Sequence, residues 1–274
     1  MRYLSILFFV SLITNAQIKR IEPPFWWEGM NDSKLQVLLY GDNIARCNVK
    51  SKGMDLVNVE RVENENYLFL NFNLSFQKKG FYDIDLYDSF DRKIDNYSYE
   101  IKSREKGKKI SSFNSSDVIY LLMPDRFANG NQSNDSHPDL TEKVNRKEQD
   151  GRHGGDIEGI IKNLDYLQEL GITTIWSTPL CEDNDPKVSY HTYAQSDVYR
   201  IDPRFGTNND YKRLAQNLHQ RGMKIIMDYV TNHWGIEHWM IKDLPNKNWI
   251  HKFDKYVNTN HRKEIHSDPY ASKK

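Results

Sequence analysis

The chain has 274 residues, which is enough for one large domain or two domains of ordinary size. Its 38 basic and 38 acidic residues balance, so no net charge favours nucleic acid or an anionic membrane surface as a partner. Two cysteines, Cys47 and Cys181, are too few for a disulfide framework or a zinc site, and we expect both to be free thiols. The many aromatic residues suit sugar rings and ordinary protein cores equally, so they leave the function open.

The first residues have the pattern of a secretory signal peptide. Met1-Arg2 gives a short positive start, residues 4–13 are almost wholly apolar, and Ala16 is a small residue at the expected cleavage point. The apolar run is too short for a stable bilayer anchor, and the charged pair Lys19-Arg20 disfavours a buried first strand. We therefore expect residues 1–16 to be removed and the protein to be periplasmic or extracellular, without a membrane anchor.

Residues 17–103 are predicted to form a small antiparallel β-sandwich. Short runs rich in β-branched and aromatic residues are separated by turn-forming segments, and two of the runs alternate apolar with polar residues as half-buried strands do. The predicted strands are residues 35–40, 67–74 and 81–87. The charged, Ser-rich segment 104–116 has no apolar periodicity and is predicted to be a linker.

From residue 117 onward the pattern changes to alternating strands and helices. A buried strand is predicted at 118–123 and further strands at 172–176 and 224–228. Helices with apolar residues at helical spacing are predicted at 157–167 and 207–222. Such alternation builds a parallel sheet with right-handed crossovers, which is either a (βα)8 barrel or an open sheet. No Gly-rich phosphate loop follows the first strand, so a nucleotide-binding open sheet is disfavoured.

The loop after the first of these strands is rich in side-chain oxygens. Asn129, Asn131, Asn134 and Asp135 stand at close, uneven spacing, and Gly130 allows a sharp bend between them. Hard oxygen ligands of this kind suit calcium. An Asn-rich turn whose side chains cap their own backbone explains the same residues equally well, so the sequence leaves both interpretations open.

Polar and aromatic residues also follow the next two strands. A long loop after the second strand contains the run SYHTY at 189–193, and its aromatic content argues against disorder. Asp228 and Asn232 point to the same side of the third strand, and His233 follows in the loop. Because the carboxyl ends of parallel strands meet at one edge, we favour a functional site there.

These residues resemble a known family. The run DYVTNH at 228–233 resembles the first signature region of the α-amylase superfamily, glycoside hydrolase family 13. Four further motifs agree in order and spacing, and the run PFWWEGM at 24–30 resembles the sandwich module that precedes the barrel in neopullulanases and cyclomaltodextrinases. These motifs are MPDRFANG at 123–130, GGDI at 154–157, YHTY at 190–193, and DPRFG at 202–206 with Asp210-Tyr211.

The resemblance implies an antiparallel β-sandwich followed by the first three βα units of an incomplete (βα)8 TIM barrel. The barrel units would span 117–233, and residues 234–274 would begin the insertion after the third barrel strand. His191, Tyr193 and His233 resemble the residues that bind the glucose unit whose bond is cut, with Tyr193 as a stacking platform. Asp228 resembles the aspartate that orients a downstream arginine, and Asn232 resembles a supporting position.

A calcium site is also implied by the resemblance. Asn131 stands where the family commonly has aspartate, which removes one negative charge from the site. Thr192 stands where the family often has glycine, and because a β-branched residue does not easily take a positive φ, we expect a different loop geometry. The implied ligands are Asn129, Asn131, Asn134, Asp135, the carbonyl of Gly154, and Asp156.

By family the expected activity is retaining hydrolysis of α-1,4 or α-1,6 bonds in starch, maltodextrin, pullulan or cyclodextrin. The family's catalytic carboxylates follow later strands, and no acidic residue between 234 and 274 stands in a matching motif. We therefore expect an amino-terminal fragment that contains no catalytic residue and is inactive alone. The alternatives are a non-catalytic maltodextrin-binding protein, with Trp26-Trp27 as its platform, and a transporter-associated family member. The family also implies a homodimer through the amino-terminal module.

Overall fold

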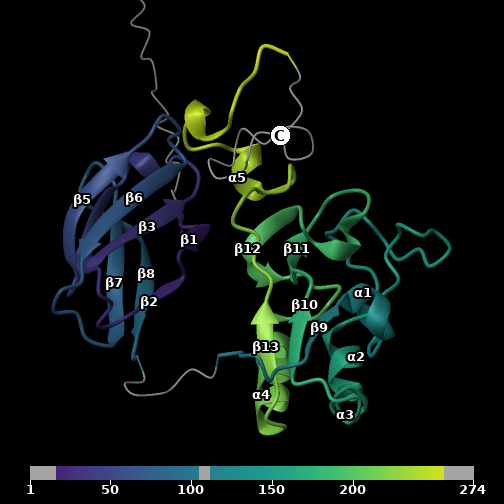
Figure 1. Cartoon of the computed structure of the whole chain (residues 1–274). Coiled ribbons are helices and arrows are strands. Elements are labelled where there is room, and N and C mark those ends of the chain that lie inside the picture. The colour runs from purple at the N-terminus through teal and green to yellow at the C-terminus, as the bar shows by residue number, and fades with distance from the viewer. Residues whose placement is uncertain (1–16, 105–111, 256–274) are drawn as a thin grey trace, which may run out of the picture. The chain divides into compact units, whose positions relative to one another are not determined.

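A computed structural model describes residues 17–104 and 112–255 (Figure 1). The chain divides into two compact units, the first formed by Met1–Arg104 with Leu244–Lys274 and the second by Glu105–Asp243. The predicted signal peptide (1–16), the middle of the predicted linker (105–111) and the end of the predicted insertion (256–274) lie outside the described residues.

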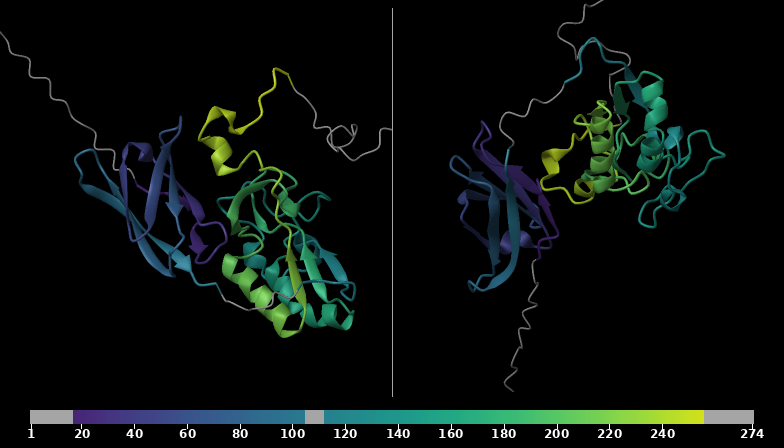
Figure 2. Two further views of the ribbon diagram at one scale, coloured as in Figure 1. Left: turned by 60° about the vertical axis from the view of Figure 1, so that its left-hand side comes forward. Right: turned by 90° about the horizontal axis from the view of Figure 1, so that it is seen from below.

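The first unit contains a β-sandwich of two four-stranded sheets, whose layers Figure 2 shows. All neighbours are antiparallel except β2 and β8, which run parallel. One sheet has the order β1 (Arg20–Glu22), β3 (Lys34–Tyr40), β6 (Tyr67–Asn73), β5 (Asp55–Arg61), with the short turn η1 (Ile44–Arg46) beside it. The other has the order β2 (Phe25–Trp27), β8 (Lys93–Lys102), β7 (Gly80–Tyr87), β4 (Asn48–Lys52).

Alternate residues of both sheets meet in one apolar core. Val37, Leu70 and Ile84, from three different strands, are completely buried in it. The three strands predicted at 35–40, 67–74 and 81–87 are present as β3, β6 and β7, whereas β1, β2, β4, β5 and β8 were not predicted. β7 alternates in its second half as predicted, but the first four residues of β6 are all buried. Trp26 packs against this core. Of the predicted binding platform, only Trp27 stands at the surface, where 36% of it is exposed.

The described residues from Leu244 onward, 244–255, belong to the first unit rather than the second. The Asn64 backbone N–H donates to the Pro245 carbonyl (3.1 Å) and its side-chain amide to the Leu244 carbonyl (2.9 Å). The ring of Trp249, in the turn η4 (Lys247–Trp249), lies 6.0 Å from that of Phe69. The segment 234–274, predicted as the start of one insertion, is thus divided between the two units.

The second unit is built on a three-stranded parallel sheet of order β13 (Lys224–Met227), β10 (Thr174–Ser177), β9 (Ile119–Leu122). This is the arrangement that strand–helix alternation predicts for the start of a barrel. The antiparallel hairpin β11 (Cys181–Asp183) and β12 (Gln195–Ile201) follows β10. The helices are α1 (Pro124–Phe127), α2 (Ile157–Lys162), α3 (Leu164–Glu169), α4 (Asn208–Gln220) and α5 (Trp239–Lys242), with short turns η2 (Gln132–Asn134) and η3 (Ser189–His191).

The helices begin and end largely where the sequence signals place them. The predicted capping box opens α4, since Thr207 and Asp210 each accept a hydrogen bond from the other's backbone N–H. Gly171 and Gly222 follow the predicted helices with φ of 85° and 71°. The helix predicted over 157–167 is instead two helices, because Asn163, with ψ of 15°, ends α2 and begins α3.

Among the described residues, helices cover only one face of the parallel sheet. Leu122 and Ile175 are buried in the core formed with α2, α3 and α4. On the opposite face Leu121 is 58% exposed and Trp176 39% exposed. The run 118–123 was therefore wrongly predicted to be wholly buried. Both cysteines are free, as predicted, and both are buried. No helix within the described residues is long and apolar enough to cross a membrane.

Candidate functional site

The candidate site lies at the carboxyl ends of β9, β10 and β13, where three loops come together. Arg126, from the loop after β9, places its guanidinium carbon 4.1 Å from the centre of the Tyr190 ring. The Tyr190 ring lies 5.0 Å from that of His191, which lies 5.5 Å from that of Tyr193. A row of rings thus runs along the loop after β10, anchored at one end by a cation–π contact.

Asp228 joins the other end of this row to β13. Its Oδ2 accepts hydrogen bonds from the Tyr193 hydroxyl (3.0 Å) and from the Trp176 indole N–H (3.3 Å). Burial, together with the hydrogen bond to Asp228, raises the pKa of the Tyr193 phenol, so the hydroxyl keeps its proton and donates at neutral pH. Burial lowers the pKa of His191, which favours a neutral imidazole that both donates and accepts. Such a row can hydrogen-bond and stack on a sugar.

The turn that carries these rings has an unusual backbone. Val188 and Thr192, on either side of η3, have φ of 62° and 51°. Thr192 therefore takes the left-handed conformation that its β-branched side chain was expected to prevent. Its side chain is buried and its hydroxyl donates to the Pro179 carbonyl, and contacts of this kind offset the strain of the backbone.

Asn232 and His233 lie apart from this hydrogen-bond network. Both are exposed, and the Asn232 amide nitrogen lies 3.1 Å from His233 Nδ1. The hydrogen bonds and ring contacts described for the unit do not connect either residue to His191, Tyr193 or Asp228. The structure thus brings together three of the five predicted sugar-site residues and leaves the other two as a separate pair.

The oxygen-rich loop after β9 folds onto the start of α2. Asp156 is the N-cap of that helix, and its Oδ1 accepts from the backbone N–H groups of Gly159 (2.6 Å) and Gly130 (2.9 Å). Its Oδ2 accepts from the Asn131 N–H (2.9 Å). Gly130 is needed because a Cβ there would stand 2.3 Å from the Gly159 nitrogen, so close approach, rather than a bend, explains this glycine.

The remaining oxygens lie in the same place. Asp135 Oδ1 accepts from the Asn129 amide (2.5 Å) and stands 2.6 Å from where a Cβ of Gly154 would lie. Asn134 Oδ1 is buried and has no hydrogen-bond partner, which is unusual for a buried polar atom. Asn131 Oδ1 instead caps η2, accepting from the N–H (3.1 Å) and hydroxyl (2.7 Å) of Ser133.

This donor set fits a calcium ion, which takes about six to eight oxygen ligands. The Asn134 oxygen, which has no hydrogen-bond partner, and Asp156 Oδ2, which accepts one hydrogen bond, are the acceptors that a cation would use first. Arg146 already donates to Asp135 Oδ2 (2.6 Å) and would compete with the ion for that oxygen. Among the described residues, no cluster of three or more His, Cys, Asp or Glu side chains could hold a metal, so neutral Asn and backbone oxygens would supply much of the coordination.

Several residues that hold the site were not predicted to do so. Arg126 contacts Tyr190, and Trp176 donates to the predicted site residue Asp228. Arg126 lies in the motif MPDRFANG, but the motif does not report the partner of this side chain. Asp125, which is buried, accepts from the backbone N–H groups of His153 (2.9 Å) and Gly154 (3.1 Å). A lone buried carboxylate of this kind shows its role only when the distant segment it binds is known.

Comparison with known protein families agrees with the two units. The family model described as the α-amylase catalytic domain matches residues 121–273, and the model of the cyclomaltodextrinase amino-terminal domain matches residues 20–105. The chain therefore belongs to the α-amylase family. Within that family its first unit is of the cyclomaltodextrinase type, so the incomplete barrel and the sandwich are both as predicted.

Individual relatives match part of the chain. It is 42% identical to neopullulanase 2 of Thermoactinomyces vulgaris over 47% of this chain and 22% of that protein. It is 38% identical to a maltogenic α-amylase of Bacillus acidopullulyticus over 54% of this chain and 24% of that protein. The solved structure of an Anoxybacillus α-amylase is 40% identical in sequence to this chain and has a TM-score of 0.47. The match covers 53% of this chain and 30% of the amylase chain. The chain thus matches less than a quarter of the length of both curated relatives.

Proposed function

We propose that this chain supplies part of the sugar-binding surface of an α-glucan hydrolase that works with retention by double displacement. The relatives named above are a neopullulanase and a maltogenic α-amylase, which supports an α-glucan as the substrate. The observation that carries the proposal is the link from Tyr193 to Asp228, which joins the loop after β10 to the end of β13 at the edge where such folds do their chemistry.

The roles of the residues follow from their geometry. The Tyr193 ring, 39% exposed, would stack on one sugar ring while Asp228 fixes its hydroxyl. Neutral His191 would hydrogen-bond a sugar hydroxyl beside it. Asp228 would keep its second oxygen for a further donor. A role for His233 and Asn232 in completing the surface rests on the family motif, because the described contacts do not join them to the other three residues.

Hydrolysis requires more than this surface. A retaining mechanism needs a nucleophilic carboxylate and an acid about 5–5.5 Å apart on either side of the scissile bond. Asp228 Oδ2 already accepts two hydrogen bonds, and Asp183 and Asp202 are buried. We therefore do not assign these three carboxylates to the catalytic pair. We propose that the 274-residue chain binds maltooligosaccharides without cutting them.

Two measurements on the purified chain test this function. Calorimetry with maltoheptaose should show binding that Tyr193→Ala abolishes, while Tyr166→Ala, which changes an exposed tyrosine on α3, should leave it intact. A reducing-sugar assay with maltodextrin or pullulan should show no more release than an Asp228→Ala control. Clear turnover above that control would contradict the proposed division of roles.

The alternative, a non-catalytic binding protein that uses the sandwich, makes the opposite prediction. Trp27→Ala would then abolish maltoheptaose binding, and Tyr193→Ala would not. Because Trp26 packs against the sandwich core, the platform for this alternative is one tryptophan instead of two.

We also propose that calcium binds the loop after β9, where it would neutralise the Asp135 and Asp156 carboxylates and fix the loop against α2. Asn129, Asn134, Asp135, Asp156 and the Gly154 carbonyl would hold it. Calcium should then raise the melting temperature, and Asn134→Ala should abolish the rise. This variant leaves the Asp156 cap intact, so it is a cleaner test than Asp156→Ala. An undiminished response in Asn134→Ala would argue for a simple turn.

Export and self-association are separate proposals. We propose that residues 1–16 direct export and that the sandwich mediates a homodimer. Amino-terminal sequencing of the secreted protein and its molar mass in solution test them.

A further inference from the structure

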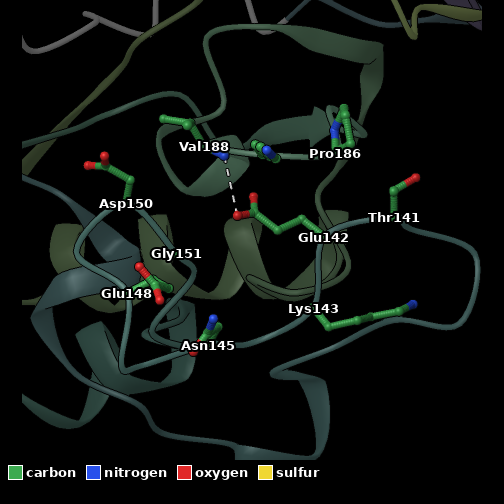
Figure 3. Close-up of a pocket in the computed structure, with 10 residues that line it drawn as sticks. Thr141, Glu142, Lys143, Asn145, Glu148, Asp150, Gly151, Pro186 and Val188 are labelled. Carbon is green, nitrogen blue, oxygen red and sulfur yellow. Dashed lines mark hydrogen bonds between the residues drawn. The ribbon is translucent and has the colours of Figure 1, made fainter.

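A cavity of about 520 Å³ lies between the loop after β9 and the segment that leads into η3. Figure 3 shows Glu142 pointing across this cavity toward Val188. Glu142 is therefore placed to act on the turn that carries His191 and Tyr193, although it stands 49 residues before His191 in the chain.

Both carboxylate oxygens of Glu142 bind the start of that turn. Oε1 accepts from the Val188 N–H (3.2 Å), and Oε2 accepts from the N–H (2.7 Å) and hydroxyl (2.6 Å) of Ser189. Hydrogen bonds to a charged acceptor are about twice as strong as neutral ones. Glu142 thus holds the two residues at which the chain enters its left-handed conformation.

The same serine is held from its other side. Arg152, which is 1% exposed, donates from Nη1 to the Ser189 carbonyl (2.9 Å) and hydroxyl (3.3 Å). Arg152 is in turn paired with buried Asp202 at 3.7 Å. Arg204, also paired with Asp202, donates to the backbone carbonyl of Glu142 (2.8 Å), so the segment that carries the carboxylate is itself fixed.

The backbone conformation explains why the contacts of Glu142 with Val188 and Ser189, which we call the clamp, are needed. Non-glycine residues with positive φ cost energy and persist only where surrounding contacts hold them. Val188 and Thr192 are both of this kind and flank the three-residue turn. Without the carboxylate at its start, the turn would lose the contacts that keep His191 and Tyr193 in line.

We propose that Glu142 is a positioning residue for sugar binding: it holds the 188–193 turn so that His191 and Tyr193 present one binding surface. The identity of the ligand rests on the proposed function, whereas the clamp itself does not. Glu142 touches no sugar in this proposal and acts only through Ser189 and Val188.

The test compares Glu142→Ala, Glu142→Gln and the control Glu148→Ala in the whole chain. Glu148 lines the same cavity, and the described hydrogen bonds of the turn do not include its side chain. Amide hydrogen exchange of Val188 and Ser189 is measured against β10 as an internal reference, and maltoheptaose affinity is measured by calorimetry. Glu142→Ala should speed exchange of these two amides by about tenfold relative to β10 and weaken maltoheptaose binding by about tenfold. Glu142→Gln, which keeps one acceptor, should be intermediate, and Glu148→Ala should match the wild type.

The outcomes separate the two proposals. Unchanged exchange at Val188 and Ser189 in Glu142→Ala, or faster exchange by the same factor in β10, would overturn the positioning role. If Glu142→Ala does not fold, Glu142→Gln decides the question. The same two quantities are then compared with the wild type: amide exchange at Val188 and Ser189 relative to β10, and maltoheptaose affinity. If the wild-type chain binds no maltoheptaose while the variant still loosens the turn, the proposed function fails and the clamp stands.

Discussion

The two units of this chain stabilise themselves in different ways. The sandwich closes its core between two sheets, so each inner face is covered by the other. The parallel sheet has helices over one face, while Leu121 and Trp176 on the other face are largely exposed. Two packed sheets can close a core with few residues, because each covers the inner face of the other. A parallel sheet needs other elements to cover both of its faces. The polar loops at the sheet edge therefore belong to the unit whose apolar surface is less completely buried.

Charges are also used differently. Ion pairs of the sandwich lie at the surface, as in Lys19–Asp42, whose side chains are 49% and 65% exposed. In the second unit Arg152, Arg204 and Asp202 are almost fully buried. Buried ions cost desolvation energy, so each depends on its partners, and removal of one member leaves the others buried without their counter-charge.

The largest expected difference is in resistance to protease. Residues 17–104 should survive limited proteolysis, while residues 112–243 should be cut quickly, because the uncovered sheet face opens readily and favours aggregation. Mass spectrometry of the fragments measures this. A second unit that resists protease as long as the sandwich would show that it is self-sufficient after all.

Breaking the buried ion cluster should have the next largest effect. Asp202→Ala leaves Arg152 and Arg204 buried without their carboxylate and should destabilise the second unit by about 3–5 kcal/mol. Asp42→Ala in the sandwich should cost less than about 1 kcal/mol. Denaturant unfolding of both variants gives the comparison. Equal effects would contradict the contrast between the two kinds of ion pair.

Asp183 should make the second unit sensitive to pH. Burial raises its pKa from 3.8 to about 7, so the folded state holds this proton more tightly than the unfolded state. The stability this provides is complete below the ordinary pKa and is lost as the pH rises through about 7. The melting temperature should therefore fall between about pH 5 and about pH 8, and less so in Asp183→Asn. Asp165→Asn, at an exposed carboxylate, should keep the wild-type slope. Identical slopes in all three proteins would remove Asp183 as the cause.

The smallest effect concerns the cap of α4. Thr207→Ala removes the hydroxyl that accepts from the Asp210 N–H and should destabilise the second unit by about 1 kcal/mol. Because the cap lies entirely within the second unit, the unfolding midpoint of the sandwich should stay unchanged. A shift of both midpoints would mean that the units unfold together.

The sequence predicted features that depend on neighbouring residues. Three strands of the sandwich, β3, β6 and β7, and the Thr207 capping box follow from local composition and spacing, and these predictions are confirmed. The other five strands of the sandwich were not predicted. The helix break at Asn163 was missed, because helical apolar spacing continues across it.

Features that depend on distant residues were not predictable. The left-handed Thr192 follows from its buried contact with Pro179, which overrides the preference of a β-branched residue. The Glu142–Ser189 contact joins segments 47 residues apart, and no local pattern reports it. For the candidate site, motifs thus indicated which residues gather, while the residues that hold them in place required the structure.

The central claim is that Tyr193 and Asp228 act as one sugar-binding unit. A double-mutant cycle tests it directly, with maltoheptaose affinity measured for the wild type, Tyr193→Phe, Asp228→Asn and the double variant. If the hydrogen bond between them orients the ring for sugar, each single variant should weaken binding, and the double variant should be little worse than either one. The coupling should be about 1 kcal/mol. Additive effects, or single variants that bind like the wild type, would contradict the claim.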